Sequence, residues 1–138
     1  MIARLGIALA LIGLGLGTYT LRTKWQIMRL KQPGFSAPDG LRPSVPAIVY
    51  FWSEACTSCM LVQKPVLEQL QGELGHDHVQ VIAINALEQP EIADKWGVLG
   101  LPTTFVVDKY GQPHHVNHGV ASIGKLRQQI ESLKDSIG

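Results

Sequence analysis

The chain has 138 residues, which is enough for one compact domain and too few for two of ordinary size. Hydrophobic residues make up 46% of the chain and charged residues 17%, a balance that excludes a wholly disordered protein. The formal net charge is +1, but residues 1–44 carry six basic side chains and one acid, whereas residues 45–138 carry six basic side chains and ten acids. A net-acidic folded part without a basic stripe argues against nucleic-acid binding.

An uncharged apolar segment occupies residues 5–21. As a helix it would span about 26 Å, slightly less than the roughly 30 Å hydrocarbon layer of a membrane. Four basic residues follow within ten positions, which is typical of a stop-transfer flank. We therefore expect residues 1–31 to form a single-pass membrane anchor with a basic juxtamembrane segment, in contact with lipid through residues 5–21. The alternative is a cleaved signal peptide with its cleavage site at residues 15–17.

The basic flank also bears on orientation and assembly. The positive-inside rule places the following domain on the cytoplasmic face, with the extracytoplasmic face as the alternative, because Arg4 and the amino terminus are the only positive charges before the segment. Gly6, Ala10, Gly13 and Gly17 form a stripe of small residues along one side of the helix. Such stripes let two membrane helices approach closely, so the sequence leaves open a dimer of anchor helices.

The rest of the chain divides into a linker and a domain. Residues 32–44 are rich in Pro and Gly and predict a linker, so the folded domain is expected to cover residues 45–138. The continuous apolar run at residues 47–52 predicts a strand that is buried on both faces. Apolar positions at helical spacing predict a helix from residue 56 to about residue 71, bent near Pro65.

Five further elements follow in chain order. They are a strand at 79–84, a helix at 91–96, strands at 103–107 and 113–118, and a helix from 122 to about 137. The turn at residues 108–111 joins the last two strands as a hairpin. The order β-α-β-α-β-β-α predicts an α/β fold with a mixed central sheet, because the first crossover makes a parallel pair and the hairpin adds antiparallel strands.

The two cysteines, Cys56 and Cys59, lie at the junction between the first strand and the first helix of the domain. Two cysteines cannot build a dense disulfide framework, nor can they alone complete a structural zinc site. The free N–H groups and the positive end of a helix stabilise a thiolate at the first helical position, so we expect Cys56 to be the nucleophile. Cys59 lies almost one turn further on and is expected to resolve the resulting mixed disulfide.

Two blocks of the sequence carry a family resemblance. The first is AIVYFWSEACTSC at residues 47–59, and the second is ADKWGVLGLPTTF at residues 93–105. They resemble the active-site strand with its redox turn, and the segment leading to the cis-proline, in the thioredoxin family. Gly119 matches the glycine after the hairpin, and the resemblance covers about residues 45–138. It implies a minimal thioredoxin-like fold, here preceded by one transmembrane helix.

The resemblance also implies roles for particular residues. Pro102 would be cis and packed beside the CxxC motif, and the backbone of Leu101 would pair with an extended substrate. Trp52 would help to build the surface around the dithiol. Thr57 and Ser58 replace the usual Gly-Pro pair, which tunes the redox potential, and complete the expected substrate-binding set.

Two positions depart from the family pattern. Tyr50 stands where the family has a buried carboxylate that moves a proton to and from the second cysteine, and Ala83 stands where a lysine usually neighbours it. The resemblance therefore implies that water, Glu54 or a substrate group would serve instead. We expect Tyr50 to be a core aromatic residue whose hydroxyl reaches the edge of the domain.

These observations predict a membrane-tethered thiol–disulfide oxidoreductase that acts on protein thiols and disulfides. Its other partner would be an oxidoreductase that donates or accepts electrons, and no cofactor or metal is expected. One alternative is a copper chaperone that uses the CxxC motif with a histidine, and another is a redox-silent binding module. The candidate histidines are His76, His78, His114, His115 and His118. Histidines in exposed loops and edge strands are usually only solvated, so disulfide exchange is the preferred interpretation.

Overall fold

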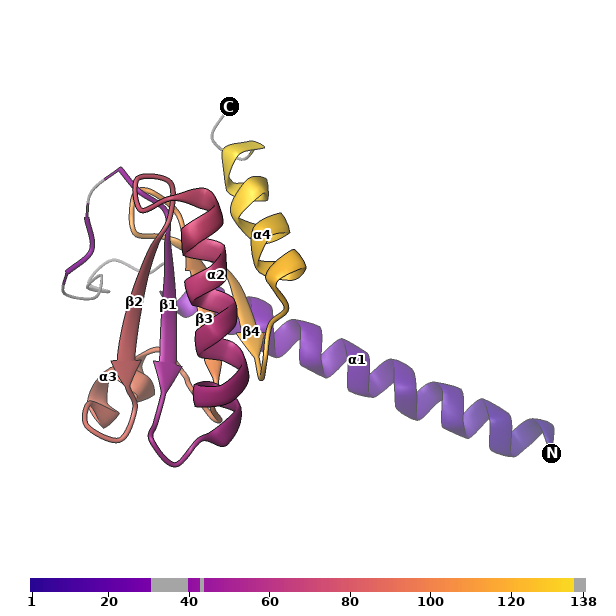
Figure 1. Cartoon of the computed structure of the whole chain (residues 1–138). Coiled ribbons are helices and arrows are strands. Elements are labelled where there is room, and N and C mark those ends of the chain that lie inside the picture. The colour runs from indigo at the N-terminus through magenta and orange to yellow at the C-terminus, as the bar shows by residue number, and fades with distance from the viewer. Residues whose placement is uncertain (31–39, 43, 136–138) are drawn as a thin grey trace.

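The computed structural model describes residues 1–30, 40–42 and 44–135 (Figure 1). A four-stranded sheet with the order β2-β1-β3-β4 forms its centre. The strands are β1 (Ala47–Trp52), β2 (Gln80–Asn85), β3 (Thr103–Val107) and β4 (Pro113–His118). β1 is parallel to β2 and antiparallel to β3, and β3 is antiparallel to β4. The expected α/β fold with a mixed sheet is therefore confirmed.

Helices cover both faces of this sheet (Figure 1). The helices are α1 (Ile2–Leu30), the π-helical turn η1 (Cys59–Gln63), α2 (Lys64–Leu74), α3 (Pro90–Lys95) and α4 (Ile123–Asp135). Ile48 and Tyr50 of β1 pack in one core cluster with residues of α2 and α4. Val49 and Phe51 point the other way, into a second cluster with Trp96. Two covered faces explain why β1 is a continuous apolar run and does not alternate with polar residues.

The helix after the cysteines differs from the predicted one. Instead of one bent α-helix, the π-helical turn η1 precedes α2, and the N–H of Lys64 bonds to the carbonyl oxygen of Cys59 five residues earlier. Pro65 follows directly and has no N–H, so the change of hydrogen-bond register falls beside it. α2 then continues to Leu74, beyond the predicted end, and stops at Gly75, which has a positive φ of 86°.

Helix α1 is continuous over 29 residues, so it is about 44 Å long, more than a hydrocarbon layer requires. One helix of the described chain, over Ile2–Met28, is long and apolar enough to cross a membrane. Most of the predicted linker, residues 32–39 and 43, lies outside the described residues. The backbone N–H of Arg42 donates to the side chain of Gln80 over 2.9 Å, which ties the end of this segment to β2. The pairing of anchor helices stays a prediction.

Candidate functional site

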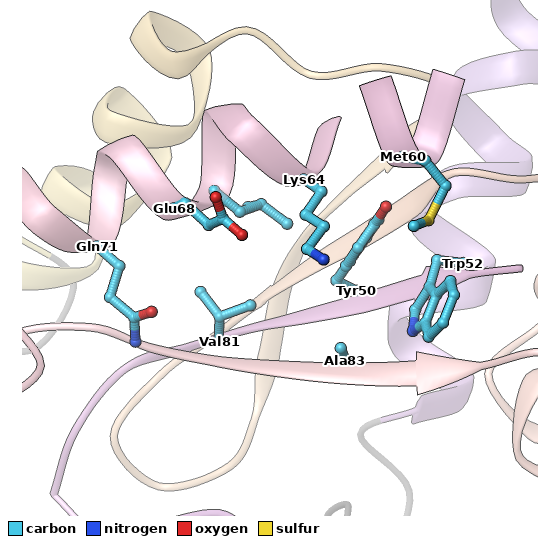
Figure 2. Close-up of a pocket in the computed structure, with 9 residues that line it drawn as sticks. Tyr50, Trp52, Met60, Lys64, Glu68, Gln71, Val81 and Ala83 are labelled. Carbon is cyan, nitrogen blue, oxygen red and sulfur yellow. The ribbon is translucent and has the colours of Figure 1, made fainter. Parts of the chain in front are cut away.

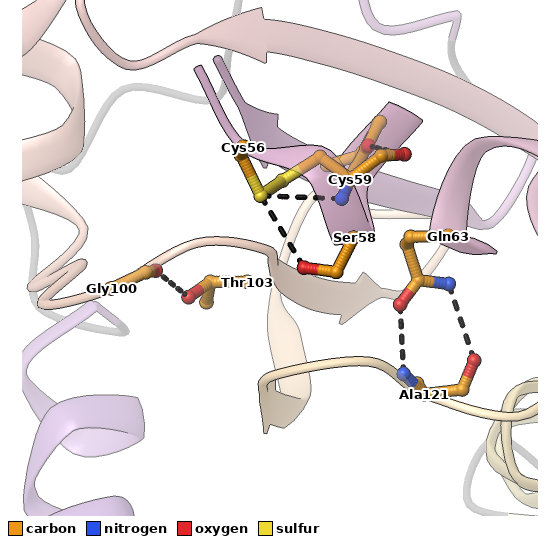
Figure 3. The surroundings of a disulfide bond; sticks show 8 residues. Cys56, Ser58, Cys59, Gln63, Gly100, Thr103 and Ala121 are labelled. Carbon is orange, nitrogen blue, oxygen red and sulfur yellow. Dashed lines mark hydrogen bonds between the residues drawn. A yellow bond between two sulfur atoms is a disulfide. The ribbon is translucent and has the colours of Figure 1, made fainter. Parts of the chain in front are cut away.

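The two cysteines lie between the end of β1 and the helix that follows it (Figure 3). Cys56 and Cys59 are joined by a disulfide, with their Cα atoms 5.2 Å apart. The N–H of Cys56 donates to the carbonyl of Ser53 over 3.2 Å, and its own carbonyl accepts the N–H of Met60 over 3.3 Å. Cys56 is therefore the N-cap of the helix, because its carbonyl accepts the first helical hydrogen bond. The sequence predicted Cys56 at the next position, the first residue of the helix.

This cap position determines the electrostatics of the Cys56 sulfur. The backbone N–H of Cys59 donates to Cys56 Sγ over 3.2 Å, and the Ser58 hydroxyl lies 3.5 Å from the same sulfur (Figure 3). An N–H donor and the positive end of a helix both favour a negative charge on that atom. Cys56 is half-buried, whereas Cys59 is fully buried. The arrangement gives the half-buried Cys56 the surroundings of a stabilised thiolate and keeps Cys59 away from solvent.

One feature that the family resemblance implied for Pro102 is present, the cis peptide bond. The Leu101–Pro102 peptide bond is cis, and the carbonyl of Pro102 accepts the N–H of Gly119 over 2.9 Å. Leu101 packs against the core cluster that contains Cys59, as Cys56 also does. The loop that carries the cis bond is thus held by packing on the core cluster of Cys59 and by a hydrogen bond from the residue that follows β4.

The other predicted site residues, Thr57, Ser58 and Trp52, differ in their exposure to solvent. Thr57 is exposed and Ser58 half-buried, both on the turn between the two cysteines. Trp52 is half-buried and packs on the Cys59 cluster, but it also lines a cavity of about 240 Å³ between α2 and β2 (Figure 2). The complete lining of that cavity is Tyr50, Trp52, Met60, Lys64, Leu67, Glu68, Gln71, Val81 and Ala83.

This cavity holds the two positions at which the family pattern is broken. Tyr50 and Ala83 are paired neighbours on β1 and β2 and line its sheet side, and two ionisable side chains of α2, Lys64 and Glu68, line its helix side (Figure 2). Neither side chain was predicted from the sequence to lie at the site. A pattern in the sequence could have indicated them. Residues that recur every four positions share one side of a helix, as Met60, Lys64 and Glu68 do.

The hydroxyl of Tyr50 does not reach the edge of the domain, which corrects the sequence-based expectation. It donates a buried hydrogen bond of 2.7 Å to the carbonyl of Cys59. That carbonyl also accepts the N–H of Lys64 in the π-helical turn, so the turn provides an acceptor close to the ring. Burial raises the pKa of Tyr50 to about 12, so the hydroxyl stays protonated and remains a donor at neutral pH.

Replacing Tyr50 with Phe should lower the free energy of unfolding by about 1 kcal/mol, the net value of one buried hydrogen bond. Urea unfolding of the full chain measures the change. Tyr110 is the matched control, because it is 69% exposed in the hairpin turn, and its change to Phe should shift the free energy by less than about 0.5 kcal/mol. Equal stability of the two variants would show that the Tyr50 hydroxyl contributes nothing.

Gln63 is a further residue beside the redox turn that was not predicted from the sequence. Its side chain is fully buried, and its amide makes two hydrogen bonds with the backbone of Ala121, as Figure 3 shows. Gln63 Oε1 accepts the N–H of Ala121 over 2.7 Å, and Gln63 Nε2 donates to the Ala121 carbonyl over 3.2 Å. The π-helical turn that begins at Cys59 is thereby joined to the loop that follows Gly119.

The histidines do not gather around the dithiol. In the part of the chain that the structure describes, which includes all five histidines, no group of three His, Cys, Asp or Glu side chains is arranged to hold a metal ion. His114 lies 2.7 Å from Asp108, and His115 lies 3.0 Å from the Ser132 hydroxyl, so both have partners on the domain itself.

Comparison with known proteins agrees with this geometry. Residues 39–132 match the thioredoxin family. Chloroplastic thioredoxin Y of Oryza sativa subsp. japonica is 33% identical over 107 residues, which are 76% of this chain and 62% of the rice protein, so the chain spans less than two thirds of that relative. A thioredoxin of Rhodospirillum rubrum is 37% identical over 94 residues, which are 68% of this chain and 88% of the relative.

Solved structures show the same fold. Chloroplastic thioredoxin z superposes with a TM-score of 0.60 at 25% identity, covering 67% of this chain and 80% of its own. A malarial protein superposes with a TM-score of 0.58 at 19% identity, covering 64% of this chain and 96% of its own. The family match spans the dithiol, the cis-proline and the whole mixed sheet, and this chain therefore belongs to the thioredoxin family.

Proposed function

We propose that this chain is a membrane-tethered oxidoreductase that exchanges disulfides with protein substrates. The observation that carries the proposal is the asymmetry of the dithiol. Cys56 is half-buried and accepts an N–H at the start of a helix, whereas Cys59 is fully buried within disulfide distance of it. A redox-silent binding module would need neither this pairing nor the difference in exposure.

The exchange proceeds in two steps that conserve electrons. The Cys56 thiolate attacks one sulfur of a substrate disulfide, which breaks, and the other substrate sulfur leaves as a thiolate. Cys59 then loses its proton and attacks the Cys56 sulfur, so the protein disulfide forms and the substrate leaves as a dithiol. The substrate gains two electrons and the protein loses two, which a partner oxidoreductase must restore.

We assign residues 1–31 to the anchor, residues 32–44 to the connection and residues 45–138 to the redox domain. Trp52, Thr57, Ser58, Leu101 and Pro102 are the residues that we expect a substrate to contact. The basic flank after residue 21 favours the cytoplasmic face, where thiols are kept reduced and the dithiol would act as a reductant.

The test uses membranes from cells that express the full chain, washed with alkaline carbonate and equilibrated with glutathione buffers of graded potential. Alkylation and mass measurement should show that the protein stays in the membrane fraction and passes through one two-electron transition. The control is Cys59→Ser, which cannot form the internal disulfide. Loss of the protein from washed membranes would contradict the tether, and the absence of a Cys56–Cys59 disulfide at every potential would contradict the exchange.

A further inference from the structure

The end of helix α1 is attached to the redox domain. Gln26 Nε2 donates to the carbonyl of Trp96 over 2.7 Å and to that of Gly97 over 3.0 Å. Gly97 has a positive φ of 70°, which favours glycine, and a Cβ on it would lie 2.9 Å from the Gln26 amide nitrogen, so a larger residue there would displace the Gln26 side chain. Ile27 packs against the core cluster that contains Trp96. A helix that only served as an anchor would need none of these contacts.

This attachment forms a groove beside the cis-proline loop. A cavity of about 370 Å³ lies between the two, with Tyr19, Arg22 and Thr23 on the α1 side. Its other lining residues are Leu99, Gly100, Leu101, Thr103, His118 and Gly119. The rings of Tyr19 and His118 meet edge to face with their centroids 6.2 Å apart, at the end of β4. Leu101 lines this groove and also packs against the core cluster of Cys59, so the cis-proline loop connects the groove with that cluster.

The groove is positively charged. Arg22 lines it and also lines an adjoining cavity of about 210 Å³, where Lys95 adds a second positive charge. Among the described residues no Asp or Glu lines either cavity. Burial lowers the pKa of His118, and the charge of Arg22 lowers it further, so the field of Arg22 acts on the groove side of the domain.

We propose that α1 and the cis-proline loop together form a substrate groove in which Arg22 selects protein segments that carry an acidic side chain next to the disulfide. This inference rests on the proposed function and adds the substrate class. The competing occupant is an anionic lipid headgroup, since Arg22 directly follows the apolar segment. A peptide is favoured because Arg22 lines the same cavity as Leu101, and Leu101 packs against the core cluster that contains Cys59.

The test compares two cyclic disulfide peptides that differ only in Glu or Gln next to one cysteine. The reduced full chain, in phosphatidylcholine nanodiscs, should reduce the Glu peptide about fivefold faster in the second-order rate constant of a single turnover, the ratio that one exposed charge pair of about 1 kcal/mol supplies. Arg22→Gln should bring the ratio close to one. Lys24→Gln is the matched control. It removes one positive charge from the same helix, but Lys24 lines neither cavity. Gln26→Leu should also lower the ratio, because it removes the two hydrogen bonds that attach α1.

The outcomes separate this inference from the proposed function. Reduction of both peptides at equal rates by the unmodified chain overturns the inference alone. An equal loss of preference in Arg22→Gln and Lys24→Gln overturns it as well, because only the total charge would then matter. If Arg22→Gln alters binding to phosphatidylglycerol vesicles but leaves the peptide ratio at fivefold, the groove holds lipid and the inference is wrong. Failure to reduce either peptide overturns the proposed function and this inference with it.

Discussion

Replacing Cys56 with Ser is expected to abolish disulfide reduction, with a loss of about a thousandfold or more in the rate of a single turnover. The physical reason lies in the surroundings of the sulfur. A half-buried atom that accepts the Cys59 N–H at a helix start is stabilised as a thiolate, whereas a serine hydroxyl in the same position stays protonated at neutral pH. The measurement is stopped-flow reduction of a cyclic disulfide peptide by the pre-reduced full chain.

Cys59→Ser should give a different defect. The fully buried Cys59 is not exposed to substrate, so the first attack by Cys56 should still occur, and the mixed disulfide should accumulate because nothing resolves it. Mass spectrometry after non-reducing electrophoresis detects that species. Ser58→Ala serves as a control close to the sulfur, because it removes a 3.5 Å contact and keeps both thiols. Full activity of Cys56→Ser, or trapping by Cys56→Ser and not by Cys59→Ser, would overturn the assigned roles.

Replacing Gln63 with Leu should destabilise the domain by about 2–4 kcal/mol. Gln63 is fully buried, and Ala121 is 1% exposed, so water cannot replace the two lost hydrogen bonds. An apolar side chain of similar size would leave the N–H and the carbonyl of Ala121 without their partner. Urea unfolding of the full chain should show a lower midpoint with an unchanged slope.

Gln69→Leu is the matched control for this change. Gln69 lies on the exposed side of α2, where its amide reaches only Glu73 over 3.2 Å, so the same substitution should shift the free energy by less than about 0.5 kcal/mol. If Gln63→Leu were as stable as Gln69→Leu, the buried amide would not be the link between the π-helical turn and the loop at Ala121.

The sequence was sufficient for the sheet. The bounds of β1, β3 and β4 agree with the predicted residues, because each strand is a run of side chains whose apolar or alternating pattern is local and is bounded by Pro or Gly turns. The predicted β2 was shifted by one residue and α2 was extended by three, since helix and strand ends depend on caps and neighbours as well as on composition. The CxxC motif and the proline before β3 could be found for the same reason.

The contacts that surround the dithiol could not be predicted in this way. Tyr50 bonds to a carbonyl that became available through a π-helical turn, and no periodicity of the sequence specifies that turn. Gln63 and Ala121 are 58 residues apart, and Gln26 and Trp96 are 70 residues apart. In the sequence, no local pattern marks these residues as partners of one another.

By itself, the sequence determined the order of the elements, the cysteine pair at a strand–helix junction and an uncharged apolar segment at residues 5–21, because each is encoded by residues that are neighbours in the chain. Only the tertiary structure decided that the N–H of Cys59 points at the Cys56 sulfur. It also decided that the buried Gln63 joins the π-helical turn to the loop after β4, and that Gln26 of α1 bonds to the domain at Trp96. Those contacts join distant segments, so they exist only after packing has brought the partners together and removed the water that would otherwise satisfy them.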